Sequence, residues 1–375
     1  MSTLKVNKLE STTSGGNCVV NATNISSRNM IINGACQVNQ LGTGTGITNG
    51  NLGYKGGADQ WRTIPYNLGT YTVSNDSEAP DEFGNSYKLD CTTASASPAA
   101  DGEMGINFRM EGNLLQGLAY GTSSAKTTTL SFWVRCTKTG NFQVNLKNND
   151  RDRIISSVVT ISSANTWEKK VITFAGDTTA NQVIDNDNTN CFQIEIYLDA
   201  GSDLKGGTAP SAWEARAQTD RAAGVTLAFG DNTSNDIYFT GMQWEIGERA
   251  TEFEWKSYND QLLDCLRYLR VYGGSAAYQR VGIGYFSNTT RLECPLTLAP
   301  PMRTTPTMTV SNAGHWKAES PSGSGEFTAV GLDGNSSNQV AIIWGDKSNT
   351  FTAGESGRYL ADNTTDARIY LAAGL

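Results

Sequence analysis

The stretch MQWEIGERATEFEWKSYNDQLLDCLRYLRVYGG, residues 242–274, changes its hydrophobic period halfway along. Up to Trp255, apolar and polar residues alternate, which predicts a β-strand with one buried face. Across residues 259–270 the leucines recur at helical spacing, and the glycine pair that follows favours a helix stop. One short amphipathic helix therefore follows a region of strands and divides the chain into two parts.

The composition favours strands over helices. The chain has 375 residues, of which 39 are glycine, and only 18% of residues are charged. Glycine, Asn, Ser and Thr crowd every segment, which is typical of short strands joined by polar turns. The formal net charge is -8 and no basic stripe is visible, which argues against nucleic-acid binding.

Membrane insertion and secretion also find no support in the sequence. No apolar run approaches the ~20 residues that a membrane-spanning helix needs. The opening MSTLKVNKLESTTSGG lacks the apolar core of a signal peptide. We therefore expect a protein that is made in a cytoplasm and does not insert into a membrane.

Strict alternation marks the strands of the first part. It occurs in LSFWVRC, FQVNLK, CFQIEIYLD and NDIYFTGMQWEIG, at residues 130–136, 142–147, 191–199 and 235–247. Alternation indicates antiparallel sheets with one buried face each, so we predict an all-β jelly-roll sandwich. Strand patterns resume after the helix and predict a second, smaller β-domain, in which Pro300, Pro301 and Pro306 exclude central-strand positions.

Four segments follow from these patterns. We predict an N-terminal attachment segment at 1–28, the jelly-roll domain at 29–257, the short helix at 258–274 and a C-terminal β-domain at 275–375. Within the first segment, STLKVNKL alternates like a strand that has no local partner. Its unpaired backbone groups are a template for strand addition, so it docks either on its own domain or on a partner.

The predicted helix has an apolar stripe. Leu262, Leu266 and Leu269 follow one another at i, i+4 and i+7. A helix of about 12 residues is marginal in water, so it must pack against something. Two alternatives stay open: the helix lies against the sandwich as a linker, or three copies meet around an axis as a collar. In the second alternative, these leucines form the trimer interface.

Catalytic and redox motifs are missing from the sequence. The seven cysteines are scattered without a C-x-x-C pair, which argues against zinc and redox sites, and we expect reduced, buried fillers. The single histidine, His315, has no nucleophile motif nearby. Glu245, Glu248, Glu252 and Glu254 alternate along a strand, so we expect a solvated face rather than paired catalytic carboxylates. We predict no catalytic residue and no cofactor.

The motif DNDNT resembles part of a calcium loop. It places Asp185, Asp187 and Thr189 at alternate positions. The EF-hand pattern fails, because Asn190 stands where glycine is required and Ile196 stands where the final glutamate is required. We predict no metal site of this type, and a structural calcium in a sandwich loop stays open as an alternative.

Sugar binding calls for aromatic rings that stack on the apolar faces of sugars, together with polar side chains that hold the hydroxyls. The C-terminal part offers His315, Trp316, Trp344 and Tyr359. Trp316 follows a loop pattern and is expected at the surface, whereas Trp344 is expected nearer the core. Trp133 and Trp167, in the sandwich, are expected to be packing residues.

Several motifs occur in a fixed order along most of the chain. They are NMIINGACQVNQLG at 29–42, GADQWR at 57–62, SFWVR at 131–135, TWEKKVITFAGDT at 166–178, QWEIGERATEFEWKSYNDQLLDCLRY at 243–268 and CPLTLAPPMRTTPTMTVS at 294–311. In this order they resemble phage tail fibres and receptor-binding proteins, and STLKVNKL resembles the first strand of marine phage fibre proteins. The chain departs from the pattern at Leu41 and Gln60, where arginine is usual.

The resemblance implies a homotrimer built into the tail fibre of a virion. It implies a carbohydrate-module-like jelly roll, a short helix and a C-terminal receptor-binding tip. The expected partners are a tail, baseplate or adaptor protein, bound through residues 1–28, and a host surface polysaccharide, bound by the distal part. Two alternative functions stay open: a glycan-degrading tailspike, and a structural or adaptor piece without receptor affinity. No β-helix repeat of the kind found in depolymerases is visible.

Overall fold

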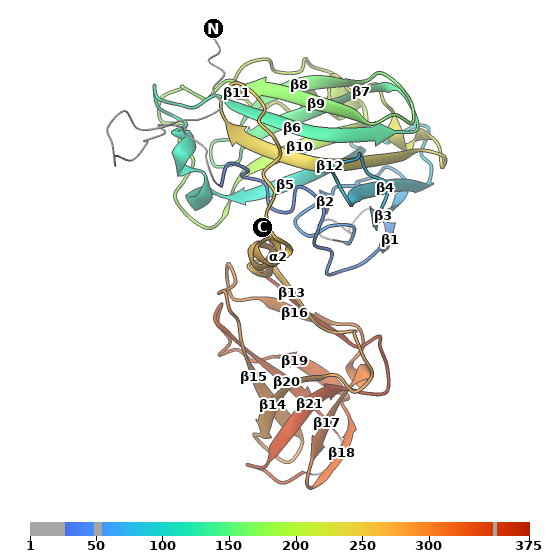
Figure 1. Cartoon of the computed structure of the whole chain (residues 1–375), viewed down its shortest axis with the longest axis vertical. Helices are drawn as coiled ribbons and strands as arrows, with labels where there is room; N and C mark the ends of the chain where they lie inside the picture. Colours follow the sequence, from blue (N-terminus) through green and yellow to red (C-terminus); the bar gives the residue numbers. More distant parts are fainter. Residues whose placement is uncertain (1–26, 49–54, 348–350) are drawn as a thin grey trace, which may run out of the picture.

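The computed structural model describes residues 27–48, 55–347 and 351–375. The predicted attachment strand STLKVNKL lies outside these residues. Figure 1 shows a wide β-sandwich, a smaller β-unit and a short helix between them. The all-β prediction, with a jelly-roll sandwich followed by a helix and a smaller β-domain, is confirmed.

Two sheets of six strands each form the sandwich, and all their pairings are antiparallel. Sheet A has the order β1 (Gly44–Ile47), β3 (Thr70–Asp76), β4 (Ser86–Thr93), β12 (Asp236–Ile246), β6 (Thr128–Cys136), β9 (Glu168–Phe174). Sheet B has the order β11 (Glu214–Ala215), β8 (Arg153–Ile161), β7 (Gly140–Asn148), β10 (Asn190–Ala200), β5 (Glu103–Glu111), β2 (Arg62–Thr63).

The smaller unit also has two sheets. Sheet C has the order β13 (Leu269–Gly273), β22 (Arg368–Ala372), β16 (Thr307–Val310). Sheet D has the order β18 (Gly323–Glu326), β17 (Trp316–Ser320), β21 (Ser356–Ala361), β14 (Arg280–Phe286), β15 (Arg291–Thr297), β20 (Val340–Asp346), β19 (Ala329–Leu332). The helical elements within the described residues are α1 (Ser202–Lys205), α2 (Tyr258–Leu266), η1 (Gly112–Leu114), η2 (Gln116–Leu118), η3 (Gln218–Asp220), η4 (Phe229–Asp231) and η5 (Ala313–His315).

The sandwich core follows from the alternation of its strands. Phe132 of β6, Phe142 of β7 and Phe239 of β12 are fully buried, and their ring centroids lie 6.0–6.1 Å apart. A second contact stacks Phe192 on Trp244 at 5.0 Å. Burying one large apolar side chain stabilises the fold by roughly 1.5–3 kcal/mol. These inward residues therefore determine which face of each strand is exposed to solvent.

Helix α2 is shorter than predicted. Ser257 caps its start by accepting a hydrogen bond from the Asp260 backbone N–H at 3.2 Å. The helix ends at Leu266, because Leu269 and Arg270 belong to β13 and pair with β22. The predicted helix over 259–270 is therefore wrong at its C-terminal end. Strand pairing satisfies the backbone groups there, and it outweighs the helical spacing of the leucines.

A buried carboxylate joins the two units. Glu111, at the end of β5, is fully buried and accepts hydrogen bonds from Arg267 Nε at 2.7 Å, Arg267 Nη2 at 2.5 Å and Tyr268 Oη at 2.5 Å. Arg303 Nη1 also donates to the Asn188 carbonyl at 2.8 Å. These contacts hold the smaller unit against the end of sheet B.

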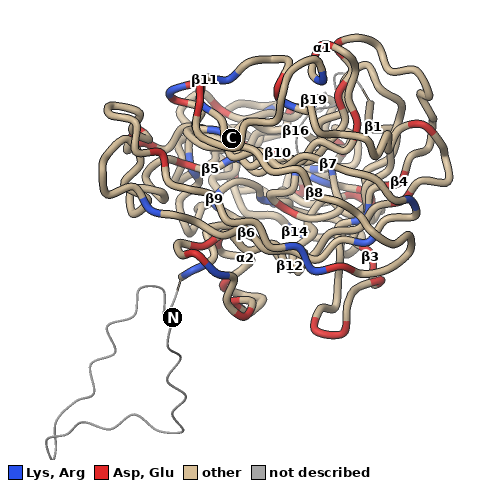
Figure 2. The backbone as a smooth tube through the Cα atoms, turned by 90° about the horizontal axis from the view of Figure 1, so that it is seen from above, with Lys and Arg blue, Asp and Glu red and all other residues tan. Residues whose placement is uncertain are grey.

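The surface carries charges of both signs. Figure 2 shows basic and acidic residues interspersed over the described part of the chain, without a continuous basic stripe. No helix in the described ranges is long and apolar enough to span a membrane.

Candidate functional site

The structure does not bring the predicted sugar-binding residues of the C-terminal unit together. Trp316 and Tyr359 are both fully buried in the core of that unit, with ring centroids 5.9 Å apart. They face inward because β17 and β21 are neighbours in sheet D and present both side chains to the same inner side. The expectation of a surface ring at Trp316 is therefore wrong, and the candidate Tyr359 is likewise a core residue.

Trp344 and His315 lie elsewhere on the same unit. The guanidinium of Arg291 sits 4.2 Å above the Trp344 ring and is held there by Asp346 through two bonds of 2.7 Å. A cation therefore covers the ring face that a sugar would use. His315 Nδ1 lies 3.2 Å from Ser311 Oγ in a short turn. Neither residue adds to a shared site.

The leucine stripe is divided between two elements. Leu262 and Leu266 are half-buried on α2, whereas Leu269 is buried within its own chain in β13. Leu269 is therefore not part of a helical face. The helix buries Gln261 and Cys265 within the chain, and the trimer interface stays a prediction for Leu262 and Leu266.

One of the acids that were expected to be solvated is buried. Glu245 is 1% exposed and accepts hydrogen bonds from Gln243 Nε2 at 2.9 Å and from the Thr251 N–H and hydroxyl at 2.8 Å each. The expectation fails here because residues 247–251 turn back over the strand. Glu254 accepts from the Asn29 N–H at 2.7 Å. Both carboxylates therefore hold backbone in place.

The DNDNT loop satisfies its own polar groups. Asp187 accepts from the Thr189 N–H and hydroxyl at 2.8 Å each, and the backbone bond is the main reason why the pKa of Asp187 is lowered. Asp185 pairs with Arg151 at 2.5 Å instead of pointing at Asp187. Among the residues that the structure describes, no three His, Cys, Asp or Glu side chains gather as metal ligands.

A hollow with two indole rings lies on the outer side of sheet A. It has a volume of about 390 Å³ and is lined by Trp133, Trp167 and residues 79–82. Trp133 faces outward because its neighbours Phe132 and Val134 point into the core. Trp167 immediately precedes β9, which pairs with β6, so sheet pairing brings the two tryptophans together.

One ring of this hollow packs against a neighbouring aromatic side chain. Trp167 meets the Tyr238 ring edge-on at 6.2 Å, and the guanidinium of Arg135 lies 5.1 Å from the centroid of that tyrosine ring. Both tryptophans are half-buried. A fixed, partly exposed aromatic surface results.

Polar groups complete the hollow. Asp81 and Glu82 line one wall and are exposed. The Trp167 Nε1–H is buried and has no acceptor in the described part of the chain. The hollow thus offers two indole side chains and two carboxylate acceptors.

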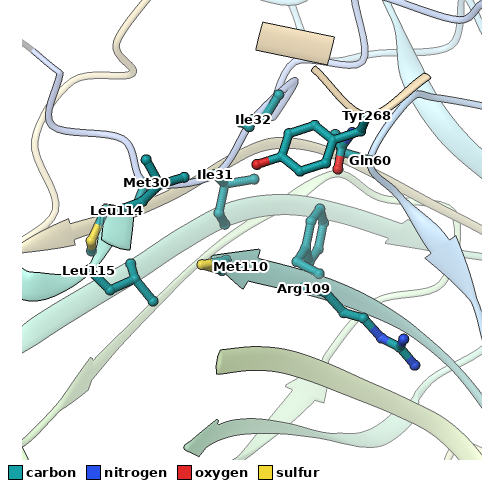
Figure 3. Close-up of a pocket in the computed structure, with 10 residues that line it drawn as sticks. Met30, Ile31, Ile32, Gln60, Arg109, Met110, Leu114, Leu115 and Tyr268 are labelled. Carbon is teal, nitrogen blue, oxygen red and sulfur yellow. The ribbon is translucent and has the colours of Figure 1, made fainter. Parts of the chain in front are cut away.

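A second pocket, at the junction of the two units, is too small for a sugar. Figure 3 shows Ile31 and Met110 between Tyr268 on one side and Met30 and Leu115 on the other. The space left between them is about 20 Å³, which is close to the volume that one water molecule needs. This apolar pocket is part of the packing between the sandwich and the segment after α2.

Comparisons with known proteins find only distant structural likenesses. No protein-family model and no curated protein matches it. Solved structures that resemble it include the enzymatically active domain of tailspike protein 4 from bacteriophage CBA120 (12% identity, TM-score 0.31, 58% of this chain and 21% of that chain). The chain thus spans about a fifth of the tailspike structure.

The names of two further structural neighbours describe sugar-binding proteins. One is a putative sugar binding protein from Bacteroides thetaiotaomicron (11% identity, TM-score 0.31, 59% of this chain and 100% of that chain). The other is TmCBM61 in complex with β-1,4-galactotriose (8% identity, TM-score 0.29, 60% of this chain and 100% of that chain). Likenesses at this level assign neither a family nor an activity to the chain.

Proposed function

We propose that this chain is a glycan-binding, non-enzymatic component of a phage tail fibre, and that the hollow between Trp133 and Trp167 receives a sugar residue of the host surface polysaccharide. The observation that carries the proposal is this hollow, with its two half-buried rings and two carboxylates. Its volume of about 390 Å³ falls in the range of roughly 300–1,000 Å³ that is usual for small-ligand sites.

The chemistry of the hollow suits a sugar. The faces of Trp133 and Trp167 accept the apolar C–H side of a pyranose ring, and they lose little entropy because they are already packed. Asp81 and Glu82 accept hydrogen bonds from hydroxyl groups, and bonds to charged acceptors contribute roughly 1.5–3 kcal/mol each.

The place of the chain in a virion rests on its sequence. The ordered motifs that resemble tail fibres support a homotrimer, attached through residues 1–28 to a tail, baseplate or adaptor protein. The sequence predicted a sugar site in the distal part, whereas the proposed site lies on the sandwich. The reason for this change is that Trp316 and Tyr359 are core residues of the distal unit.

An assay of polysaccharide binding and cleavage tests the proposal that the protein binds glycan without degrading it. Purified protein is incubated with host surface polysaccharide, and bound polysaccharide and newly formed reducing ends are both measured. We expect retention of the polysaccharide and no new reducing ends. Release of oligosaccharides would support the glycan-degrading alternative, and absence of retention would contradict glycan binding altogether.

A further inference from the structure

The smaller unit has a groove of its own, on the outer face of sheet D. It has a volume of about 460 Å³, and its lining includes Ile283 of β14, Arg358 and Ser356 of β21, Glu319 of β17 and Pro321. Strand register places Glu319, Arg358 and Ile283 in one row across three strands. The groove is separate from the hollow on sheet A.

Apolar surface forms one wall of the groove. Ile283 is 71% exposed, which is unusual for an isoleucine in a sheet. Tyr285, two residues along the same strand and on the same face, is 50% exposed, and its register partner is Ser356. The hydroxyl of Tyr285 donates to Glu293 at 3.1 Å, so its ring is held beside the groove.

Polar groups form the other wall. Arg358 Nη1 donates to Glu319 Oε2 at 2.9 Å, and the two side chains are 48% and 41% exposed. This bond uses one of the five N–H donors of the guanidinium, and the others reach no acceptor among the described residues. The Ser356 hydroxyl likewise bonds to no other described residue. Donors and an acceptor therefore lie side by side and face solvent.

We propose that this groove is a second sugar site, and that it takes a neutral pyranose with adjacent hydroxyl groups. Arg358 donates to one hydroxyl oxygen while Glu319 accepts from the next, and the C–H face of the sugar covers Ile283 and Tyr285. The charges of Arg358 and Glu319 cancel, and Glu293 lies nearby. Because Glu319 already neutralises Arg358 and Glu293 adds a negative charge, the charge beside the groove disfavours an anionic sugar.

The test follows the NMR signal of a methyl group that lines the groove. The full chain is labelled at isoleucine δ1-methyl groups, the Ile283 signal is assigned with Ile283→Val, and the methyl glycosides of glucose, galactose and mannose are titrated in turn. We expect the Ile283 methyl signal to shift with at least one neutral glycoside and not with glucuronate. Arg358→Gln and Glu319→Gln should each weaken this binding about tenfold or more, because each removes a charged hydrogen-bonding group.

Arg249→Gln, which removes an exposed arginine outside the groove, is the matched control and should leave the titration unchanged. The proposal is wrong if no neutral glycoside shifts the Ile283 signal, if glucuronate shifts it in place of the neutral sugars, or if Arg358→Gln binds as the unmodified chain does. The readout involves neither Trp133 nor Trp167. Failure here is therefore distinguishable from failure of the sandwich site.

Discussion

At the scale of single residues, Glu111 contributes a buried contact between the two units. Its carboxylate is fully buried and holds Arg267 and Tyr268. Glu111→Gln keeps the shape and removes the charge, so we expect the free energy of unfolding to fall by about 2 kcal/mol in urea titrations. Glu248→Gln, at an exposed position, should change it by less than about 0.5 kcal/mol. Equal stability of the two variants would contradict this role.

The described cysteines make a second residue-level prediction. All six are free and buried, as the sequence predicted. Burial raises the pKa of Cys91 and Cys294 to about 11 and that of Cys191 to about 12, so the reactive thiolate is scarce until the pH approaches these values. Cys18 lies outside the described residues and is removed as Cys18→Ser. We expect native Cys18→Ser protein at pH 8 to react with a thiol reagent only after unfolding; rapid labelling of the native chain would contradict it.

Of the two tryptophans that line the proposed site, the exposure of one could be predicted from the sequence and the position of the other could not. Trp133 falls on the wet side of LSFWVRC, opposite Phe132 and Val134, so strict use of alternation would have predicted its exposure. Trp167 carries no such signal, because it precedes its strand and is brought to Trp133 by the pairing of β6 with β9. Asp81 and Glu82 come from a loop whose position depends on the whole sheet.

At the scale of elements, the strands were predictable and the end of the helix was not. Phe142, Val144 and Leu146 mark β7 by period alone, because one face of a sandwich strand is buried along its length. Leu269 keeps the helical spacing, but its backbone pairs with a strand about a hundred residues away in sequence. Local patterns do not encode such long-range pairing.

Helix α2 gives a prediction at this scale. If Leu262 and Leu266 line a three-fold axis, Leu266→Asp places like charges around it and should abolish the trimer while the sandwich stays folded. Tyr258→Ala, an exposed change on the same helix, serves as the control. Mass in solution and thermal unfolding are measured together. A trimer that persists with a weakened fold would show that this face packs within one chain.

At the scale of the whole molecule, we expect the N-terminal segment to be needed for attachment to the virion but not for folding of the sandwich. Asn29 anchors the beginning of the sandwich, since its side chain donates to the Met242 carbonyl at 2.9 Å and accepts from the Trp244 N–H at 3.1 Å. Deleting residues 2–28 leaves this anchor intact. We expect the truncated protein to fold and to be missing from assembled virions. Normal incorporation into virions would contradict attachment through this segment.

Affinity for the host polysaccharide tests the central claim most directly. Immobilised polysaccharide is titrated with the unmodified chain, Trp133→Ala, Trp167→Ala and the control Tyr258→Ala, and thermal unfolding confirms that each variant is folded. Each tryptophan change removes one stacked ring, so we predict a loss of about 1.5 kcal/mol, or roughly tenfold in affinity, with Tyr258→Ala unchanged. Folded tryptophan variants that bind as tightly as the unmodified chain would contradict the account.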